Sequence, residues 1–397
     1  MGWGVTPKLR SITLLVLAQV SALSLWFISS AVLPDMLVEF EISPLAQAAL
    51  TSAVAAGFVL GALISAFTGL SDRFDPRFVF ATCACIASGS GFGLLLVDPG
   101  TVASITLRFV TGMMLAGVYP VGMKIAVGWG KEDRGLLVGV LVGALTFGSA
   151  SPHLVAWLGE AEWRLTIAIV SSCTLISAGL ILLSGLGPFH AKAPAFEASS
   201  IKKAWTIKRV RYAYLGYFGH MWELYAMWAW IGTATLASYK VSMPEADAVS
   251  LSKLTAFLAI GLGGVACILG GMVADKLGKA EVTIVAMIVS GLSALLAAVT
   301  FGGDPWITFV VVIVWGIAII PDSPQFSALV ADGSPPEIAG SLMTFQTAIG
   351  FALTILTVQL TPYLVSVTSW PTAMVIMALG PAFGVWYMLK LRALTSP

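Results

Sequence analysis

The sequence predicts an all-α integral membrane protein with twelve transmembrane helices, because three of its properties agree. Only 10% of the 397 residues are charged, whereas soluble domains average about 25%. The mean hydropathy is +0.93, and apolar residues form runs of the ~20 residues that cross a bilayer. Lys and Arg fall almost entirely on alternate connections between these runs. A soluble domain of this composition would expose large apolar patches and aggregate, whereas lipid solvates such surfaces.

Twelve apolar runs are long enough to span a membrane. We expect them at residues 12–34, 47–68, 78–97, 102–126, 135–157, 164–186, 210–238, 250–273, 281–300, 305–328, 338–363 and 368–390. Most connections are short, but a polar and basic stretch follows the sixth run. It divides the chain into an N-terminal six-helix bundle (1–187), a cytoplasmic linker (188–209) and a C-terminal six-helix bundle (210–397).

The distribution of Lys and Arg predicts the orientation, because cytoplasmic loops of membrane proteins are enriched in both residues. With the N-terminus in the cytoplasm, 17 of the 21 cations fall on the cytoplasmic side and three on the outer side. The last one, Arg108, lies within a span. We therefore expect a multi-pass protein of a bacterial-type inner membrane with both termini in the cytoplasm. The net charge of +1 gives no electrostatic support for nucleic-acid binding.

The two halves contain an internal repeat, which is the sequence feature that best indicates a secondary transporter. Equivalent residues recur at offsets of 203, 201 and 196 positions, each time at the same helix of its half. The matching pairs are Asp72-Arg73 with Asp275-Lys276, Pro120 with Pro321, and Trp26 with Trp222.

Several of these motifs resemble those of the major facilitator superfamily. The stretch Gly271-Met-Val-Ala-Asp275-Lys276-Leu-Gly278-Lys279 is similar to the loop signature Gly-x-Leu-Ala-Asp-Arg-x-Gly-Arg-Arg of that family. The first-half copy keeps Asp72, Arg73 and Arg77, but Thr68 replaces the leading glycine and Asp75-Pro76 replaces Gly-Arg. The segment Arg108-Phe-Val-Thr-Gly112 is similar to the Arg-x-x-x-Gly element of the fourth helix. The fifth span resembles the glycine- and proline-rich helix of the antiporters, although Ser151 precedes its Pro152 where they have glycine.

The resemblance implies two pseudo-symmetric six-helix bundles around a central cavity that opens alternately to each side. It also implies a charged gate on the cytoplasmic side, where the two loop carboxylates would face the starts of helices in the opposite half. The loop cations would pair there with acids such as Glu132 and Asp133. The alternative is that these charges only satisfy the membrane topology. The expected gating residues are Asp72, Arg73, Arg77, Asp275 and Lys276.

Charged residues within a span are functional candidates, because each one costs at least ~2.5–3.5 kcal/mol at mid-bilayer. Glu223 and His220 lie one turn apart in the seventh span, and both groups can exchange a proton there. They are the leading proton-coupling pair. Asp322, close to two prolines, is either a further titrating site or a cap for a kinked backbone. Arg108 is an anion anchor, a modulator of a neighbouring acid, or part of a structural ion pair.

Mid-membrane aromatic and amide side chains are candidates for lining a substrate cavity that combines apolar walls with a few polar groups. Each of them alone is more often a packing residue. The candidate substrate-binding residues are Gln19, Trp26, Arg108, Tyr119, Trp222, Trp228 and Gln346.

These observations favour a monomeric secondary active transporter of a small organic solute, coupled to protons, with export or antiport slightly favoured. Proton-coupled uptake of a small organic anion is the alternative, and an amphipathic substrate is equally compatible with the residues. Neither a phosphate-binding loop nor an ion-filter loop occurs, which argues against an ATP-driven pump and a channel. An integral-membrane enzyme that uses His153, His220 and Glu223 is the remote alternative, but the sequence has no metal motif or nucleophile elbow. We therefore expect a transporter without a metal or cofactor.

Overall fold

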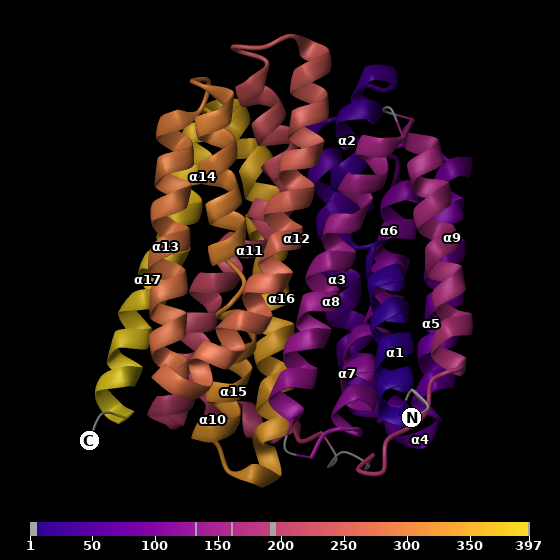
Figure 1. The fold of residues 1–397 in the computed structure, drawn as a ribbon, viewed down its shortest axis with the longest axis vertical. Helices are drawn as coiled ribbons and strands as arrows, with labels where there is room; N and C mark the ends of the chain where they lie inside the picture. Colours follow the sequence, from indigo (N-terminus) through magenta and orange to yellow (C-terminus); the bar gives the residue numbers. More distant parts are fainter. Residues whose placement is uncertain (1–5, 132, 160–161, 191–195, 396–397) are drawn as a thin grey trace, which may run out of the picture.

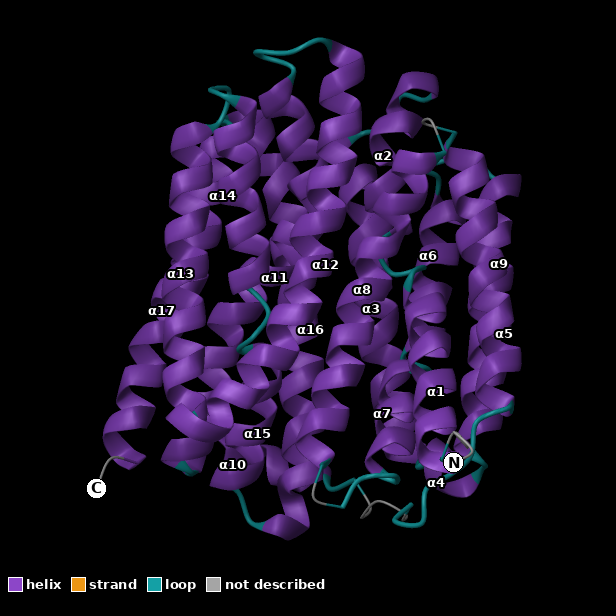
Figure 2. Cartoon of the chain, viewed as in Figure 1, coloured by secondary structure: helices purple, strands orange, loops and turns teal. Residues whose placement is uncertain are grey.

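The computed structural model describes residues 6–131, 133–159, 162–190 and 196–395, and the described residues form helices joined by loops, without strands (Figures 1 and 2). The N-terminal half contains α1 (Pro7–Leu23), α2 (Ile28–Glu39), α3 (Pro44–Thr68), α4 (Leu70–Arg73), α5 (Pro76–Gly93), η1 (Leu94–Leu96), α6 (Val102–Leu115), α7 (Tyr119–Val127), α8 (Arg134–Leu158) and α9 (Trp163–Leu182). The connection between the halves contains η2 (Ala198–Ser200) and α10 (Ile201–Thr206). The C-terminal half contains α11 (Lys208–Tyr239), α12 (Glu245–Leu277), α13 (Lys279–Thr300), α14 (Pro305–Ala318), α15 (Ser323–Gly333), α16 (Pro336–Val367) and α17 (Trp370–Thr395).

The prediction of twelve spans is confirmed. In the described part of the chain, eleven helical segments are long and apolar enough to cross a membrane. The remaining span, the seventh in chain order, is α11, which has the length but a lower hydropathy because aromatic and polar side chains replace aliphatic ones along it. Most of α11 is buried among other helices, so these side chains face protein and not lipid. The division of the chain at residues 187 and 209 stays a prediction.

Several spans begin with the same local signal, a capping side chain followed by proline. Thr6-Pro7, Ser43-Pro44, Asp75-Pro76 and Asp304-Pro305 all stand at helix starts, and each capping oxygen accepts a backbone N–H of the first turn. Proline is well suited to the first helical position because it has no N–H to satisfy there. This signal defines where these helices begin.

Close helix contacts repeat in the two halves and confirm the pseudo-symmetry. A Cβ on Gly112 of α6 would lie 1.9 Å from the carbonyl oxygen of Val54 in α3. A Cβ on Gly316 of α14 would lie 2.1 Å from the carbonyl oxygen of Ala259 in α12. Only glycine permits such an approach of two backbones. The two glycines therefore hold equivalent helix pairs together in each half.

Three spans are interrupted: the first between α1 and α2, the fourth between α6 and α7, and the tenth between α14 and α15. Pro120 and Pro321 stand at the last two breaks, as the repeat predicts, because proline removes a backbone donor. The first break, at residues 24–27, contains no proline or glycine. Interrupted helices at mid-membrane leave backbone groups that side chains must satisfy.

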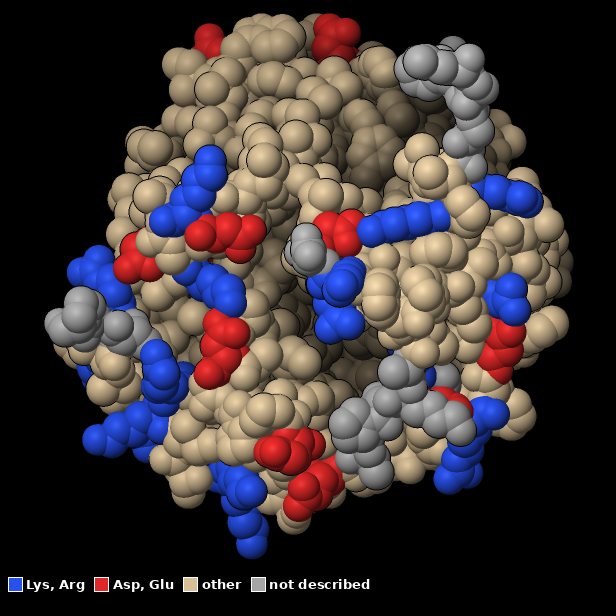
Figure 3. All heavy atoms as spheres, turned by 60° about the horizontal axis from the view of Figure 1, so that its bottom comes forward, with Lys and Arg blue, Asp and Glu red and all other residues tan. Residues whose placement is uncertain are grey.

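Figure 1 shows both ends of the described chain at the same end of the molecule, which we call the terminal face. We call the opposite end the far face. Figure 3 shows Lys and Arg side chains distributed over the terminal face together with acidic side chains.

Candidate functional site

Glu223 of α11 is the centre of a buried polar group in the C-terminal half. Its Oε1 accepts a hydrogen bond from Nε1 of Trp315 on α14 at 2.9 Å. Its Oε2 accepts one from Oγ of Ser290 on α13, also at 2.9 Å. Only 1% of the Glu223 residue is exposed. Both oxygens thus have partners, which offsets part of the cost of burying a carboxyl group in an apolar medium.

His220 lies one turn before Glu223 but pairs with a different acid. Its Nδ1 lies 3.0 Å from Oδ1 of Asp322, and both side chains are buried. Asp322 stands at the break between α14 and α15, in the N-cap position of α15, yet it makes no side-chain capping bond. The structure therefore brings the three expected proton-coupling groups of this half together and assigns the histidine to Asp322.

Arg108, the fourth expected proton-coupling residue, is fully buried on α6 and donates three hydrogen bonds to backbone carbonyls. Its Nε donates to Leu50 at 3.0 Å, its Nη1 to Leu25 at 2.8 Å and its Nη2 to Trp26 at 2.6 Å. Leu25 and Trp26 lie in the break between α1 and α2, where carbonyls lose their helical partners. Arg108 thus stabilises the broken first span, and these three partners are neutral.

Six aromatic side chains meet between the halves. Ring centroids lie 4.7–5.8 Å apart, and no member is more than 5% exposed. Two expected substrate residues, Trp26 and Trp228, belong to this group. We call it the central aromatic cluster, and its members are Trp26, Phe27, Phe58, Tyr225, Trp228 and Phe351.

The remaining expected substrate residues are distributed differently. Gln19 donates to the carbonyl of Tyr119 at 3.3 Å, and Gln346 donates to the carbonyl of Phe326 at 3.4 Å, so each amide contacts an interrupted span of its own half. The Tyr119 side chain is partly buried. Trp222 lies outside the central aromatic cluster, and its indole donates to Ile376 of α17 at 3.0 Å.

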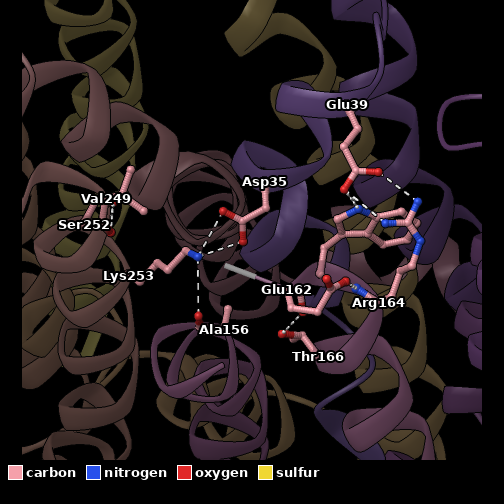
Figure 4. Close-up of polar contacts among 10 residues, drawn as sticks. Asp35, Glu39, Ala156, Glu162, Arg164, Thr166, Val249, Ser252 and Lys253 are labelled. Atoms are coloured by element: carbon pink, nitrogen blue, oxygen red, sulfur yellow. Dashed lines mark hydrogen bonds and ion pairs between the residues drawn. The ribbon is translucent and has the colours of Figure 1, made fainter. Parts of the chain in front are cut away.

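The far face contains a buried ion pair that joins the halves (Figure 4). Nζ of Lys253 on α12 lies 2.7 Å and 3.0 Å from the carboxylate oxygens of Asp35 on α2, and it donates to the carbonyl of Ala156 on α8 at 3.4 Å. A second bond between the halves runs from Gln359 of α16, which donates to Ser52 of α3 at 2.7 Å. We call the Asp35–Lys253 pair the far-face latch.

Sequence reasoning missed the far-face latch because each partner lies near the end of a long apolar run, where charges are common. The two residues are 218 positions apart, so no local pattern connects them. The available signal was the presence of opposite charges at the same end of the first and eighth spans.

On the terminal face, two of the expected gating residues form ion pairs within the N-terminal half. Asp72 pairs with Lys124 of α7. Arg77 pairs with Asp75 at 2.7 Å and donates to the carbonyl of Ser184 at 3.1 Å. The Arg77 guanidinium holds the pKa of the Asp75 carboxyl below its usual value.

Two further acids were expected on this face. Asp133, an expected partner of the loop cations, pairs instead with Lys8 at 2.6 Å, and this bond lowers the pKa of Asp133. Glu132, the other expected partner, lies outside the described residues. The remaining gating residues, Arg73, Asp275 and Lys276, are exposed.

Comparisons with known proteins agree with this architecture. The model of the Major Facilitator Superfamily matches residues 15–358. The uncharacterized MFS-type transporter YceJ of Bacillus subtilis is 24% identical over 69% of each chain. The uncharacterized transporter ESBP6 of Saccharomyces cerevisiae is 27% identical over 54% of this chain and 32% of its own length.

Solved structures share the fold along almost the whole chain. A D-xylose–proton symporter matches with a TM-score of 0.76, 14% identity and 97% coverage of both chains. A mutant form of the nucleoside transporter NupG matches with a TM-score of 0.71, 17% identity and coverage of 98% of this chain and 100% of its own. Because the family model covers most of the sequence, the chain belongs to the Major Facilitator Superfamily and is a membrane transporter, not an enzyme.

Proposed function

We propose that this transporter moves a small organic solute by alternating access and couples the movement to protons. The observation that carries this proposal is the burial of Glu223 beside the His220–Asp322 pair. Within the described part of the chain, neither carboxyl group has a Lys or Arg partner. An uncompensated buried charge is strongly unfavourable, whereas a bound proton neutralises it. Passage through a closed intermediate is then easiest with a proton on Glu223.

The polar contacts of the two faces support a state that is closed at the far face. The far-face latch joins the halves, while the ion pairs of Asp75 and Asp133 lie within the N-terminal half. We infer that the far face opens when the latch breaks, and that Asp72, Arg73, Arg77, Asp275 and Lys276 then form the gate expected on the terminal face. The basic residues on the terminal face support our proposal that this face lies on the cytoplasmic side of a bacterial inner membrane.

The buried side chains at the centre of the molecule indicate the class of substrate. Three of the five N–H groups of Arg108 donate to carbonyls, which favours a structural role for this residue over the binding of an anion. Gln19, Tyr119 and Gln346 provide neutral polar groups at the interrupted spans. Aromatic walls with a few neutral polar groups favour an uncharged or amphipathic solute over a small organic anion. We still favour export by antiport, because the glycine- and proline-rich α8 resembles the corresponding helix of the antiporters.

The test is a transport screen in proteoliposomes under an imposed pH gradient, with wild type beside E223Q. We expect the gradient to drive wild-type transport, and E223Q, which keeps a similar shape but has no carboxyl proton to exchange, to lose this response. E245Q serves as the matched control, because Glu245 is an exposed acid paired with Lys240 at the surface. Wild-type transport that ignores the gradient, or full coupling in E223Q, would overturn the proposal.

A further inference from the structure

We propose that Glu223 binds its proton on Oε2, and that Ser290 is the positioning residue that stabilises both protonation states by reversing one hydrogen bond. This inference rests on the proton coupling proposed above. It concerns the two oxygens of one carboxyl group, which have partners of different chemistry.

The partner of Oε1 permits only one role. The indole Nε1–H of Trp315 is a donor and has no acceptor capacity. It lies 2.9 Å from Oε1, so Oε1 accepts a hydrogen bond whether Glu223 is ionised or protonated. A proton on Oε1 would find no acceptor at the indole, whereas a proton on Oε2 finds one at Ser290. The carboxyl proton is therefore directed to the other oxygen.

The partner of Oε2 permits both roles. The Ser290 hydroxyl can donate one hydrogen bond and accept others. Its Oγ lies 2.9 Å from Oε2 and 3.2 Å from the carbonyl oxygen of Met287, one turn earlier on α13. When Glu223 is ionised, the hydroxyl donates to Oε2. When Glu223 is protonated, its O–H donates to Oγ and the serine hydrogen turns to the Met287 carbonyl.

This exchange moves hydrogen atoms only and leaves every donor with an acceptor. Buried polar groups are costly when unsatisfied, so a site that changes its protonation state in apolar surroundings needs an alternative pattern of this kind. Ser290 is 1% exposed. The Met287 carbonyl supplies the second acceptor from within the same helix.

The groups around Glu223 determine what else responds to pH. The α14–α15 break contributes Asp322, and α11 itself contributes His220, which pairs with Asp322. The helices α13 and α14 face the carboxyl group with Ser290 and Trp315, which carry no charge. Loss of the proton from Glu223 places a negative charge one helical turn from His220, whose Nδ1 contacts Asp322.

The first test compares pH profiles of gradient-driven transport in S290A and S290T. Removing the hydroxyl takes a charge-assisted bond from the ionised state and a neutral bond from the protonated state. Because the first kind is about twice as strong, we expect S290A to shift the midpoint to higher pH by about 0.5–1 unit. S290T keeps a hydroxyl and should keep the midpoint. S293A, a substitution of another buried serine on α13, is the matched control.

The second test uses infrared difference spectra of the protonated carboxyl group, which E223Q identifies by removing its band. If the proton is on Oε2, then Oε1 is the carbonyl oxygen that accepts from Trp315. W315F should therefore move the C=O stretch to higher wavenumber, whereas S290A should leave it nearly unchanged. The opposite result would place the proton on Oε1 and overturn the inference, as would an unshifted pH midpoint in S290A.

The two proposals fail separately. If E223Q transports with full coupling, proton coupling at Glu223 fails and the role of Ser290 fails with it. If E223Q loses coupling while S290A keeps the wild-type midpoint, the coupling site stands and only the positioning role of Ser290 is excluded.

Discussion

The two halves of this transporter share a frame of helices but differ in the charges that they bury. In the N-terminal half the mid-span charge is Arg108, whose donors are committed to the backbone of neighbouring spans. In the C-terminal half, Glu223 accepts a hydrogen bond from the hydroxyl of Ser290, and Asp322 pairs with His220. The buried charge of the N-terminal half is thus bonded to backbone carbonyls, whereas the proton coupling that we propose is placed in the C-terminal half.

The same difference appears at the interrupted spans. Arg108 satisfies the carbonyls of the α1–α2 break, so this break is stabilised by a fixed charge. The α14–α15 break instead contains Asp322, whose partner is the buried side chain of His220 on α11. The α1–α2 break is therefore held by a cation that bonds to carbonyls, whereas the α14–α15 break carries a buried carboxyl group paired with a histidine.

Replacing Arg108 by alanine gives the largest expected effect. The substitution leaves buried carbonyls unpaired and creates a cavity, so we expect a loss of about 3 kcal/mol or more of stability. Thermal unfolding in detergent measures this loss, with R10A as the control, because Arg10 is exposed on α1. Full stability of R108A would show that Arg108 is not the support of its half.

Breaking the far-face latch tests how the halves are joined. K253M leaves the Asp35 carboxylate buried without its cation, and we expect a cost of about 3–5 kcal/mol to the state closed at the far face. The double variant D35N/K253M removes both charges and should recover much of this stability. Accessibility of a cysteine introduced at Ala156 to a membrane-impermeant thiol reagent reports on opening. Equal labelling of wild type and K253M would exclude the latch.

Two glycine substitutions sharpen the comparison because they act on what the halves share. G112A and G316A each place a Cβ against a backbone carbonyl of the neighbouring helix, and overpacking of this kind costs about 1–3 kcal/mol. We expect similar losses of thermal stability in the two variants. G179A is the control, since a Cβ at Gly179 meets nothing within 4 Å. A large difference between G112A and G316A would show that the pseudo-symmetric contacts are not energetically equivalent.

The smallest expected effect is at the terminal face. D75N weakens both the cap of α5 and the ion pair with Arg77, and because the pair is partly exposed we expect a loss below about 1 kcal/mol. The folded pKa of Asp75 is lowered, so its contribution is present above the unfolded pKa and is lost as the pH falls through the folded one. Unfolding measured between neutral and acidic pH should show the difference between D75N and wild type disappear in acid.

Sequence patterns predicted the spans and the repeat because the spans are apolar runs and the repeat consists of short motifs that recur in each half. Apolar runs of sufficient length cannot be placed elsewhere than in lipid or a core, and Pro120 and Pro321 mark two of the breaks directly. The first break has no such marker, because Arg108 stabilises it from another helix. The far-face latch and the bond between Ser290 and Glu223 also depend on which helices become neighbours. Such partners follow from packing and not from spacing along the chain.

The central claim is that Glu223 carries the proton that drives transport. The most direct measurement compares two activities of E223Q in proteoliposomes: accumulation driven by a pH gradient, and substrate exchange at equal pH on both sides. The substrate is one that the wild-type screen identifies. We predict that E223Q loses accumulation and retains exchange, because the uncharged glutamine permits alternation without proton movement. Accumulation at the wild-type level in E223Q would contradict this account.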